Sequence, residues 1–115
     1  MDISLDGLWS VEFKVDGDRR CGVVAIRNTH ISGGDSQFYW TGRLRFSDGK
    51  IWVHLEANTH ADDFAIFFGE NLNGFILGRL TGVAPKPFEK SFTVTGVTRG
   101  NLLTVVFTKQ AEALW

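Results

Sequence analysis

The feature that most constrains this chain is a strict two-residue alternation of apolar and polar side chains. In segment 7–15, GLWSVEFKV, the apolar residues are Trp9, Val11, Phe13 and Val15. Successive side chains of a β-strand point to opposite faces, so this segment predicts a half-buried strand with one face in a core. The same alternation returns in segments 37–46, 51–57 and 90–98. A chain with this pattern is expected to form sheets rather than helices.

Tight turns separate these segments, and no helical pattern of any length interrupts them. Asp16-Gly17-Asp18 and Ser47-Asp48-Gly49 are typical hairpin connections, because glycine adopts the positive φ that such turns need. Residues 28–36 are expected to be a connection. The expected strands are 7–15, 21–27, 37–46, 51–57, 64–68, 75–82, 90–98 and 102–109.

Eight sequential strands predict an all-β fold: an eight-stranded antiparallel up-and-down barrel, forming a single domain over residues 1–115. Closure removes the exposed edges that an open sheet would leave. A two-sheet sandwich has the same local pattern and stays open as an alternative.

The charge balance excludes some function classes. Twelve Lys and Arg stand against 13 Asp and Glu, giving a net charge of −1, whereas a nucleic-acid module would need a basic face. No apolar run is long enough to span a membrane. The first residues lack the basic and apolar regions of a secretion signal, so we expect a cytoplasmic protein, with neither nucleic acid nor membrane as a partner.

The residues with catalytic chemistry do not form a coherent set. His54 and Glu56 share one strand face with His60 just beyond, but zinc needs three or four convergent ligands. Val53 and Leu55 lie on the opposite, better core face, so His54 and Glu56 are expected to point outward. We therefore predict that the protein is not an enzyme and has no metal site and no cofactor.

The run Ser32-Gly33-Gly34-Asp35-Ser36 lacks the Gly-Lys-Ser/Thr of a nucleotide-binding loop. It is expected to be a turn, with a positive φ at Gly33 or Gly34 and with Asp35 accepting backbone hydrogen bonds.

Aromatic side chains are the most distinctive part of the expected core. Residues expected to be buried are Trp9, Val11, Phe13, Phe38, Trp40, Val53, Leu55, Phe92 and Val94. Four of these residues are large aromatics: Trp9, Phe13, Phe38 and Trp40. They either fill the core or, in an incompletely filled barrel, line a cavity. Since no ionisable residue is expected on these inward positions, such a cavity would take an apolar small molecule.

Three segments have apolar residues on both faces, 64–68, 75–80 and 102–107, and the first two carry the predicted contact. One face can turn to the barrel interior, and the other would have to be covered by a partner. A two-fold dimer is the commonest cover, so we predict a homodimer with Phe67, Ile76 and Leu80 at the contact.

Several segments together resemble the GrlR family, small bacterial proteins named for a negative regulator of type III secretion genes. They are Asp6-Gly7-Leu8-Trp9-Ser10-Val11-Glu12-Phe13, Cys21-Gly22-Val23-Val24, Ile31-Ser32-Gly33-Gly34-Asp35-Ser36 and Tyr39-Trp40-Thr41-Gly42. The resemblance covers the first half of the chain; beyond Ala57 only the strand rhythm and the length agree.

This resemblance implies a dimeric lipocalin-like barrel that acts by protein–protein contact, since the family's namesake sequesters a transcription activator. The namesake has four acidic residues in the loop that corresponds to residues 46–49 here, of which this chain keeps only Asp48. Asp48 is therefore the residue that the resemblance places in a partner loop. Partner choice depends on electrostatic complementarity, so the difference bears on which protein would bind.

Two functions follow from these observations. The first is a non-enzymatic regulatory protein that works as a homodimer through contacts with a protein such as a transcription activator. The alternative is a barrel of lipocalin or avidin type that binds a small, apolar, lipid-like ligand.

Overall fold

The strands close into a barrel, as the alternation predicts. The computed structural model describes residues 4–15, 17–36, 38–59, 66–67, 70–71, 75–86, 89–98 and 100–112. The barrel strands are β1 (Gly7–Val15), β2 (Asp18–Arg27), β3 (His30–Gly34), β4 (Phe38–Ser47), β5 (Lys50–Thr59), β8 (Phe75–Val83), β9 (Ser91–Thr98) and β10 (Asn101–Glu112). Their order around the barrel is β1-β10-β9-β8-β5-β4-β3-β2, and every pairing is antiparallel.

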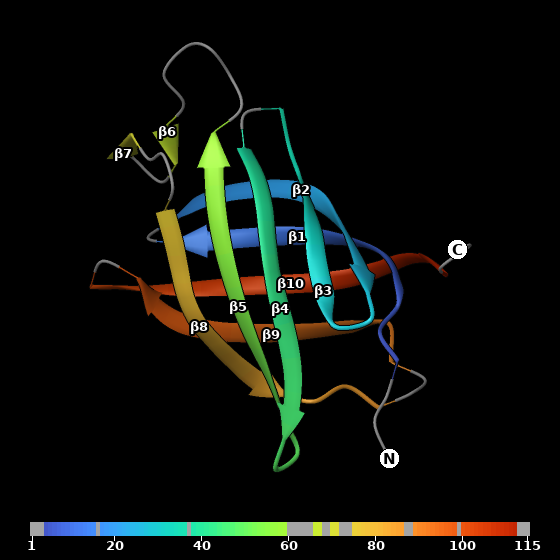
Figure 1. Cartoon of the computed structure of the whole chain (residues 1–115). Helices are drawn as coiled ribbons and strands as arrows, with labels where there is room; N and C mark the ends of the chain where they lie inside the picture. The colour runs from blue at the N-terminus through green and yellow to red at the C-terminus, as the bar shows by residue number, and fades with distance from the viewer. Residues whose placement is uncertain are drawn as a thin grey trace.

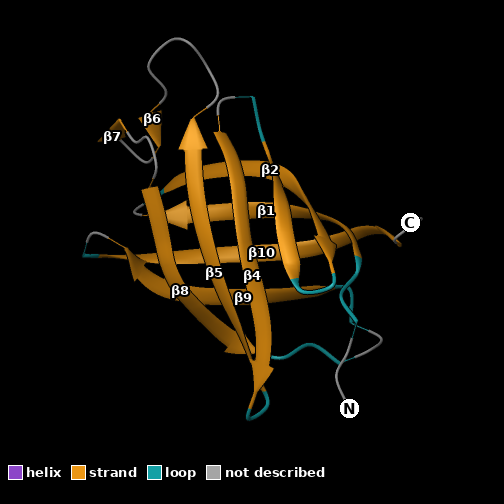
Figure 2. Ribbon diagram, in the orientation of Figure 1, coloured by secondary structure: helices purple, strands orange, loops and turns teal. Residues whose placement is uncertain are grey.

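Figure 1 shows β4, β5 and β8 side by side on one wall, with β1, β10 and β9 crossing behind them. Figure 2 shows only strands and loops in the described parts of the chain. The prediction of an all-β, eight-stranded antiparallel barrel is confirmed, and the sandwich alternative is excluded by the closure between β1 and β10.

The number of barrel strands was predicted correctly, but one predicted strand, 64–68, is not part of the barrel, and a strand within 28–36 takes its place. Segment 28–36 contains a barrel strand, β3, which pairs with both β2 and β4. Within segment 64–68, the described residues form β6 (Ile66–Phe67), which pairs with β7 (Glu70–Asn71) in a separate two-stranded sheet. Phe64 and Phe68 lie outside the described residues.

Backbone pairing rather than side-chain pattern makes β3 a strand. Ile31 is its only large apolar residue, and it is buried. Gly33 and Gly34 allow close approach of the chain: a Cβ on Gly33 would collide with the carbonyl oxygen of Val23, and one on Gly34 with that of Phe38. Neither glycine has a positive φ, so that part of the prediction was wrong.

The interior of the barrel is filled by the apolar residues of the alternating strands. All the residues expected to be buried are buried, from Phe92 at 5% exposure to Phe13, Phe38 and Trp40 at 0%. Within the described residues, no polar or charged residue is classed as buried. The ring of Phe13 lies 4.8 Å from that of Trp40, and Phe92 lies 5.2 Å from Trp9, measured between centroids.

Candidate binding surface on the outer wall

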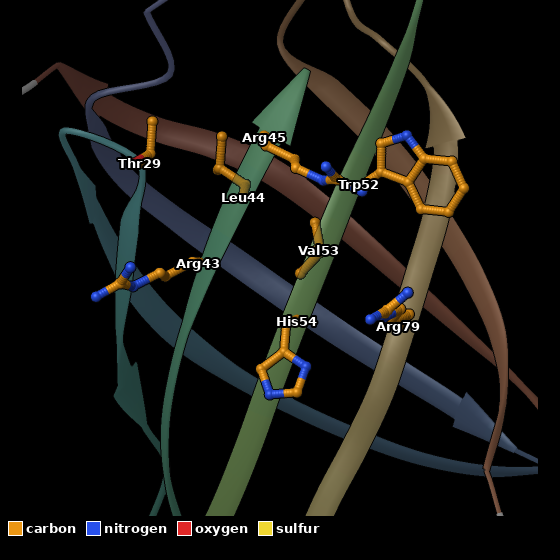
Figure 3. Close-up of a pocket in the computed structure, with 8 residues that line it drawn as sticks. All are labelled: Thr29, Arg43, Leu44, Arg45, Trp52, Val53, His54 and Arg79. Carbon is orange, nitrogen blue, oxygen red and sulfur yellow. The ribbon is translucent and has the colours of Figure 1, made fainter. Parts of the chain in front are cut away.

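The described hollows are on the outside of the barrel. One of them has a volume of about 550 Å³ and lies on the wall made by β4, β5 and β8. The residues that line it are Thr29, Arg43, Leu44, Arg45, Trp52, Val53, His54 and Arg79. In Figure 3, His54 lies between Arg43 and Arg79, and Arg45 extends toward Trp52. The hollow is thus surrounded mainly by cationic and aromatic groups.

Five neighbouring strands each carry a basic residue that pairs, in the strand register, with a basic residue on the adjacent strand. Arg27 pairs with His30, His30 with Arg43, Arg43 with His54, and His54 with Arg79. We call this set the basic row. All its members are exposed, because their chain neighbours Ile26, Ile31, Leu44, Val53 and Leu80 occupy the inward positions of the same strands.

An arginine and a tryptophan lie beside the basic row. Arg45 and Trp52 face each other across β4 and β5, two positions along from Arg43 and His54. The guanidinium carbon of Arg45 is 5.7 Å from the centre of the Trp52 ring, within the range of a cation–π contact. Trp52 is partly exposed, so one part of its ring remains available to a bound molecule.

The arginines of this wall differ in their pairing from the cations on β1 and at the start of β2. On β1 and β2, Glu12 forms ion pairs with Lys14 at 3.1 Å and with Arg19 at 3.2 Å. Arg43, Arg45 and Arg79 form no ion pair with any residue that the structure describes. Their positive charges are therefore not neutralised by an acid of the described chain.

Glu56 is the acid beside the basic row. It lies two positions along β5 from His54, and it lines a second, smaller hollow together with Thr41, Gly42, Arg43 and His54. His54 and Glu56 both point outward, as expected. His60 lies outside the described residues, and among those residues no three His, Cys, Asp or Glu side chains are close enough to hold a metal ion.

The aromatic residues proposed to line a cavity line none of the three hollows described on the outer wall. Trp9, Phe13, Phe38 and Trp40 are fully packed in the core. One expectation about their surroundings was wrong, because an ionisable residue does share the inward positions. Arg20 lies opposite Phe13, and its guanidinium carbon is 4.9 Å from the centre of the Phe38 ring.

Asp35 neutralises Arg20 at this end of the barrel. The Arg20 Nη1 atom donates to Asp35 Oδ2 at 2.9 Å, and the Phe38 backbone N–H donates to Asp35 Oδ1 at 2.8 Å. The prediction that Asp35 accepts a backbone hydrogen bond is thus confirmed. We call Arg20, Asp35 and Phe38 the latch, since the three residues contact one another across β2, β3 and β4.

The predicted dimer contact needs a correction at Leu80. This residue is 0% exposed and lies opposite Val53 inside the barrel, so it is not available to a second copy. The physical reason is a register shift: Leu55 pairs with Gly78 but Glu56 pairs with Ile76, which leaves Leu77 as an extra residue in β8.

The other two contact residues are not tested by the structure. The side chains of Phe67 and Ile76 lie outside what it describes, and the homodimer stays a prediction. Analytical ultracentrifugation of the wild type and of a Phe67→Arg, Ile76→Glu variant checks it: the wild type should be a dimer and the variant a folded monomer.

Asp48 has a clear structural role in the β4–β5 hairpin. Asp48 and Gly49 have φ angles of 54° and 74°, the left-handed pair that a two-residue type I′ turn requires. Asp48 is exposed, so its predicted place in a partner loop stays a prediction.

Comparisons with known proteins do not extend the resemblance. No protein-family model matches the sequence, and no curated protein matches it. In the described residues, no helix combines the length and the apolar character needed to cross a bilayer.

Proposed function

We propose that this protein is a non-enzymatic regulatory protein that acts by binding a protein partner on the outer wall of its barrel. The single observation that carries the proposal is the set of exposed cations on β4, β5 and β8 that form no ion pair with a described residue. Unpaired arginines next to a partly exposed tryptophan are the residue types enriched where proteins bind one another.

The packed interior supports the same proposal. The large side chains contact each other directly, with ring centroids 4.6 Å apart for Phe92 and Phe107 and 4.8 Å apart for Phe13 and Trp40. An outer surface is therefore the better place for recognition than the barrel interior.

Crosslinking in the protein's host tests the proposal. A photo-reactive amino acid replaces Thr41, which is exposed on the proposed wall, and in a control it replaces Leu102, which is 62% exposed on β10. We expect a protein adduct from position 41 that disappears in an Arg43→Glu, Arg79→Glu background and is absent from position 102. Equal adducts at both positions, or none at position 41, would contradict the proposal.

A second candidate function, binding of a small ligand inside the barrel, is favoured by one atom. The indole Nε1–H of Trp40 is buried and has no acceptor among the described residues. Buried N–H groups normally have a partner, so a ligand with a hydrogen-bond acceptor would satisfy it. Native mass spectrometry of the protein purified from its host checks this: a small apolar molecule at one equivalent favours the second candidate, and the bare mass favours the first.

A further inference from the structure

We infer that the outer wall binds an extended segment of the partner protein in which two acidic residues flank one large apolar residue, each separated from it by one residue. The inference rests on the proposed function, because it names the chemistry of the partner at the same wall. It depends on the outward side chains of a single strand, β5, and on the arginines of its two neighbours, β4 and β8.

Three outward side chains of β5 define the sites along this wall. Lys50, Trp52 and His54 alternate with the buried residues Ile51 and Val53, so the three lie on the outer face of one strand. Lys50 and His54 are exposed and Trp52 is partly exposed. The pairing of β5 with β4 has no register shift in this stretch. The face therefore presents an ammonium group, an indole ring and an imidazole in regular order.

Arginines of the neighbouring strands make the His54 site cationic. Arg43 on β4 and Arg79 on β8 are the register partners of His54, and Figure 3 shows His54 between them. Both arginines are exposed and form no ion pair with a described residue. A guanidinium group holds a carboxylate by two parallel hydrogen bonds, so an acidic side chain above His54 would have such a donor on either side. Lys50, which also forms no ion pair with a described residue, provides the second site for an acid.

Trp52 is the apolar site between these two cationic sites. Its ring centre lies 5.7 Å from the guanidinium carbon of Arg45, and it lines the same hollow as Arg43, His54 and Arg79. Tryptophan and arginine are among the residues that contribute most to binding at protein interfaces. A large apolar side chain of the partner is expected to pack against the exposed part of this ring.

The spacing of the three sites follows from the geometry of one strand. Successive outward side chains of a strand are about 6.6 Å apart, and an extended segment that runs along β5 has the same two-residue repeat. Every second residue of the segment therefore faces Lys50, Trp52 and His54 in turn, in either chain direction. Because β5 is already paired with β4 and β8, the segment cannot join the sheet as a strand and is held by its side chains. The match follows the strand direction, so it does not depend on how the barrel curves from strand to strand.

Glu56 and the charge of the whole chain favour a short acidic motif over a polyanion. Glu56 is the next outward residue of β5 after His54 and is exposed. It would repel a further acid, so the acidic part of the segment should end at the His54 site. The net charge of −1 gives the molecule no overall attraction for a nucleic acid, whose charge would continue past Glu56.

An NMR titration of the isotope-labelled full chain with a synthetic peptide tests the inference. The peptide Ser-Glu-Ser-Phe-Ser-Glu-Ser, which we call the spaced peptide, has the proposed arrangement of acids and ring. We expect saturable shifts of the backbone amide signals of Trp52 and His54, with half-saturation below about 5 mM and weaker binding at higher salt.

Four comparison probes separate the contributions of spacing, charge and ring. They are the adjacent-acid peptide Ser-Ser-Glu-Phe-Glu-Ser-Ser, the spaced peptide with Gln for Glu, the spaced peptide with Ala for Phe, and a thymidine oligonucleotide of similar length. Neighbouring side chains of an extended segment point to opposite sides, so the adjacent-acid peptide cannot present all three groups to the wall. We expect each probe to bind at least about threefold more weakly than the spaced peptide.

Matched variants locate the binding. Arg43→Gln with Arg79→Gln should weaken binding of the spaced peptide by about tenfold, the change expected when two exposed charge contacts are lost. Lys14→Gln with Arg19→Gln also removes two positive charges, but these are already paired to Glu12, so binding should stay nearly unchanged. Thermal unfolding of both variants establishes that each is folded.

Several results would overturn the inference: no saturable binding of the spaced peptide up to about 5 mM, equal binding of the adjacent-acid peptide or of the peptide without Phe, tighter binding of the oligonucleotide, or an equal loss in the two double variants. The crosslinking experiment decides the proposed function separately. A protein adduct at position 41 without peptide binding would mean that the wall binds a protein of different chemistry.

Discussion

The latch and the outer wall both combine an arginine with an aromatic ring. Only in the latch does a described acid also pair with the arginine. In the latch, Arg20 lies 4.9 Å from the Phe38 ring and 2.9 Å from the Asp35 carboxylate, with its side chain 21% exposed. On the wall, Arg45 lies 5.7 Å from the Trp52 ring, is exposed, and has no ion pair with a described acid. A cation that an acid of the same chain neutralises contributes to the fold. One that is left exposed is available to another molecule.

Substitution of the aromatic residue should give the largest difference in stability between the two regions. Phe38→Ala should lower the free energy of unfolding by about 3–5 kcal/mol, because it leaves a cavity in a fully buried site. Trp52→Ala removes a partly exposed ring from the outer wall and should cost about 1 kcal/mol or less. Urea denaturation followed by circular dichroism measures both. Similar losses in the two variants would mean that the wall contributes to folding as much as the latch does.

The acid of the latch, Asp35, should also contribute more to the free energy of unfolding than the acid beside the basic row, Glu56. Asp35→Ala removes the acceptor for both Arg20 and the Phe38 N–H, and should cost about 1.5–3 kcal/mol, the range for hydrogen bonds to charged groups. Glu56→Ala removes an exposed acid beside the basic row and should change stability by less than about 0.5 kcal/mol. Equal losses of stability in Asp35→Ala and Glu56→Ala would contradict the comparison.

At the latch, a glycine allows β3 to approach β4 closely. Gly34 precedes Asp35, and a Cβ at this position would collide with the backbone of Phe38 and come within 2.9 Å of the Tyr39 Cα. Gly34→Ala should therefore lower the free energy of unfolding by about 1–3 kcal/mol, as overpacking does. Ser32→Ala, at an exposed position of the same strand, is the control and should have little effect. An unchanged stability in Gly34→Ala would show that β3 can move away from β4.

The interior could be predicted from the sequence because its pattern is local. Alternation within segments 7–15 and 51–57 identifies Phe13 and Leu55 as inward residues without knowledge of any pairing partner, and both are buried. The same rule fails at β3, where two of five residues are glycines that have no side chain to show a pattern. It fails again at Leu80, because the extra residue in β8 reverses the alternation.

The basic row could not be predicted, because it depends on register across five strands. The outward position of Arg43 and of His54 can be recognised from each strand alone. Their alignment with Arg79 also depends on the extra residue in β8, which no local pattern reveals. The sequence pattern predicts a connection over residues 28–36, so it does not indicate that His30 lies between Arg27 and Arg43. Functional surfaces built from one residue per strand are visible only once the pairings are known.

A small net effect is expected at Trp40, where two contributions to the free energy of unfolding oppose each other. Trp40→Phe leaves a small cavity in a site that is 0% exposed, which lowers stability. The same change removes a buried N–H without a described acceptor, and relief of such an unsatisfied donor raises stability by about 1–3 kcal/mol. The net change should therefore be within about 1 kcal/mol of zero in urea denaturation. Phe13→Leu, at the ring 4.8 Å away, is the control, because it removes volume without relieving a donor and should only destabilise. A loss of about 3 kcal/mol or more in Trp40→Phe would show that the indole N–H is satisfied in the folded protein. Recognition inside the barrel would then gain over recognition on its outer wall.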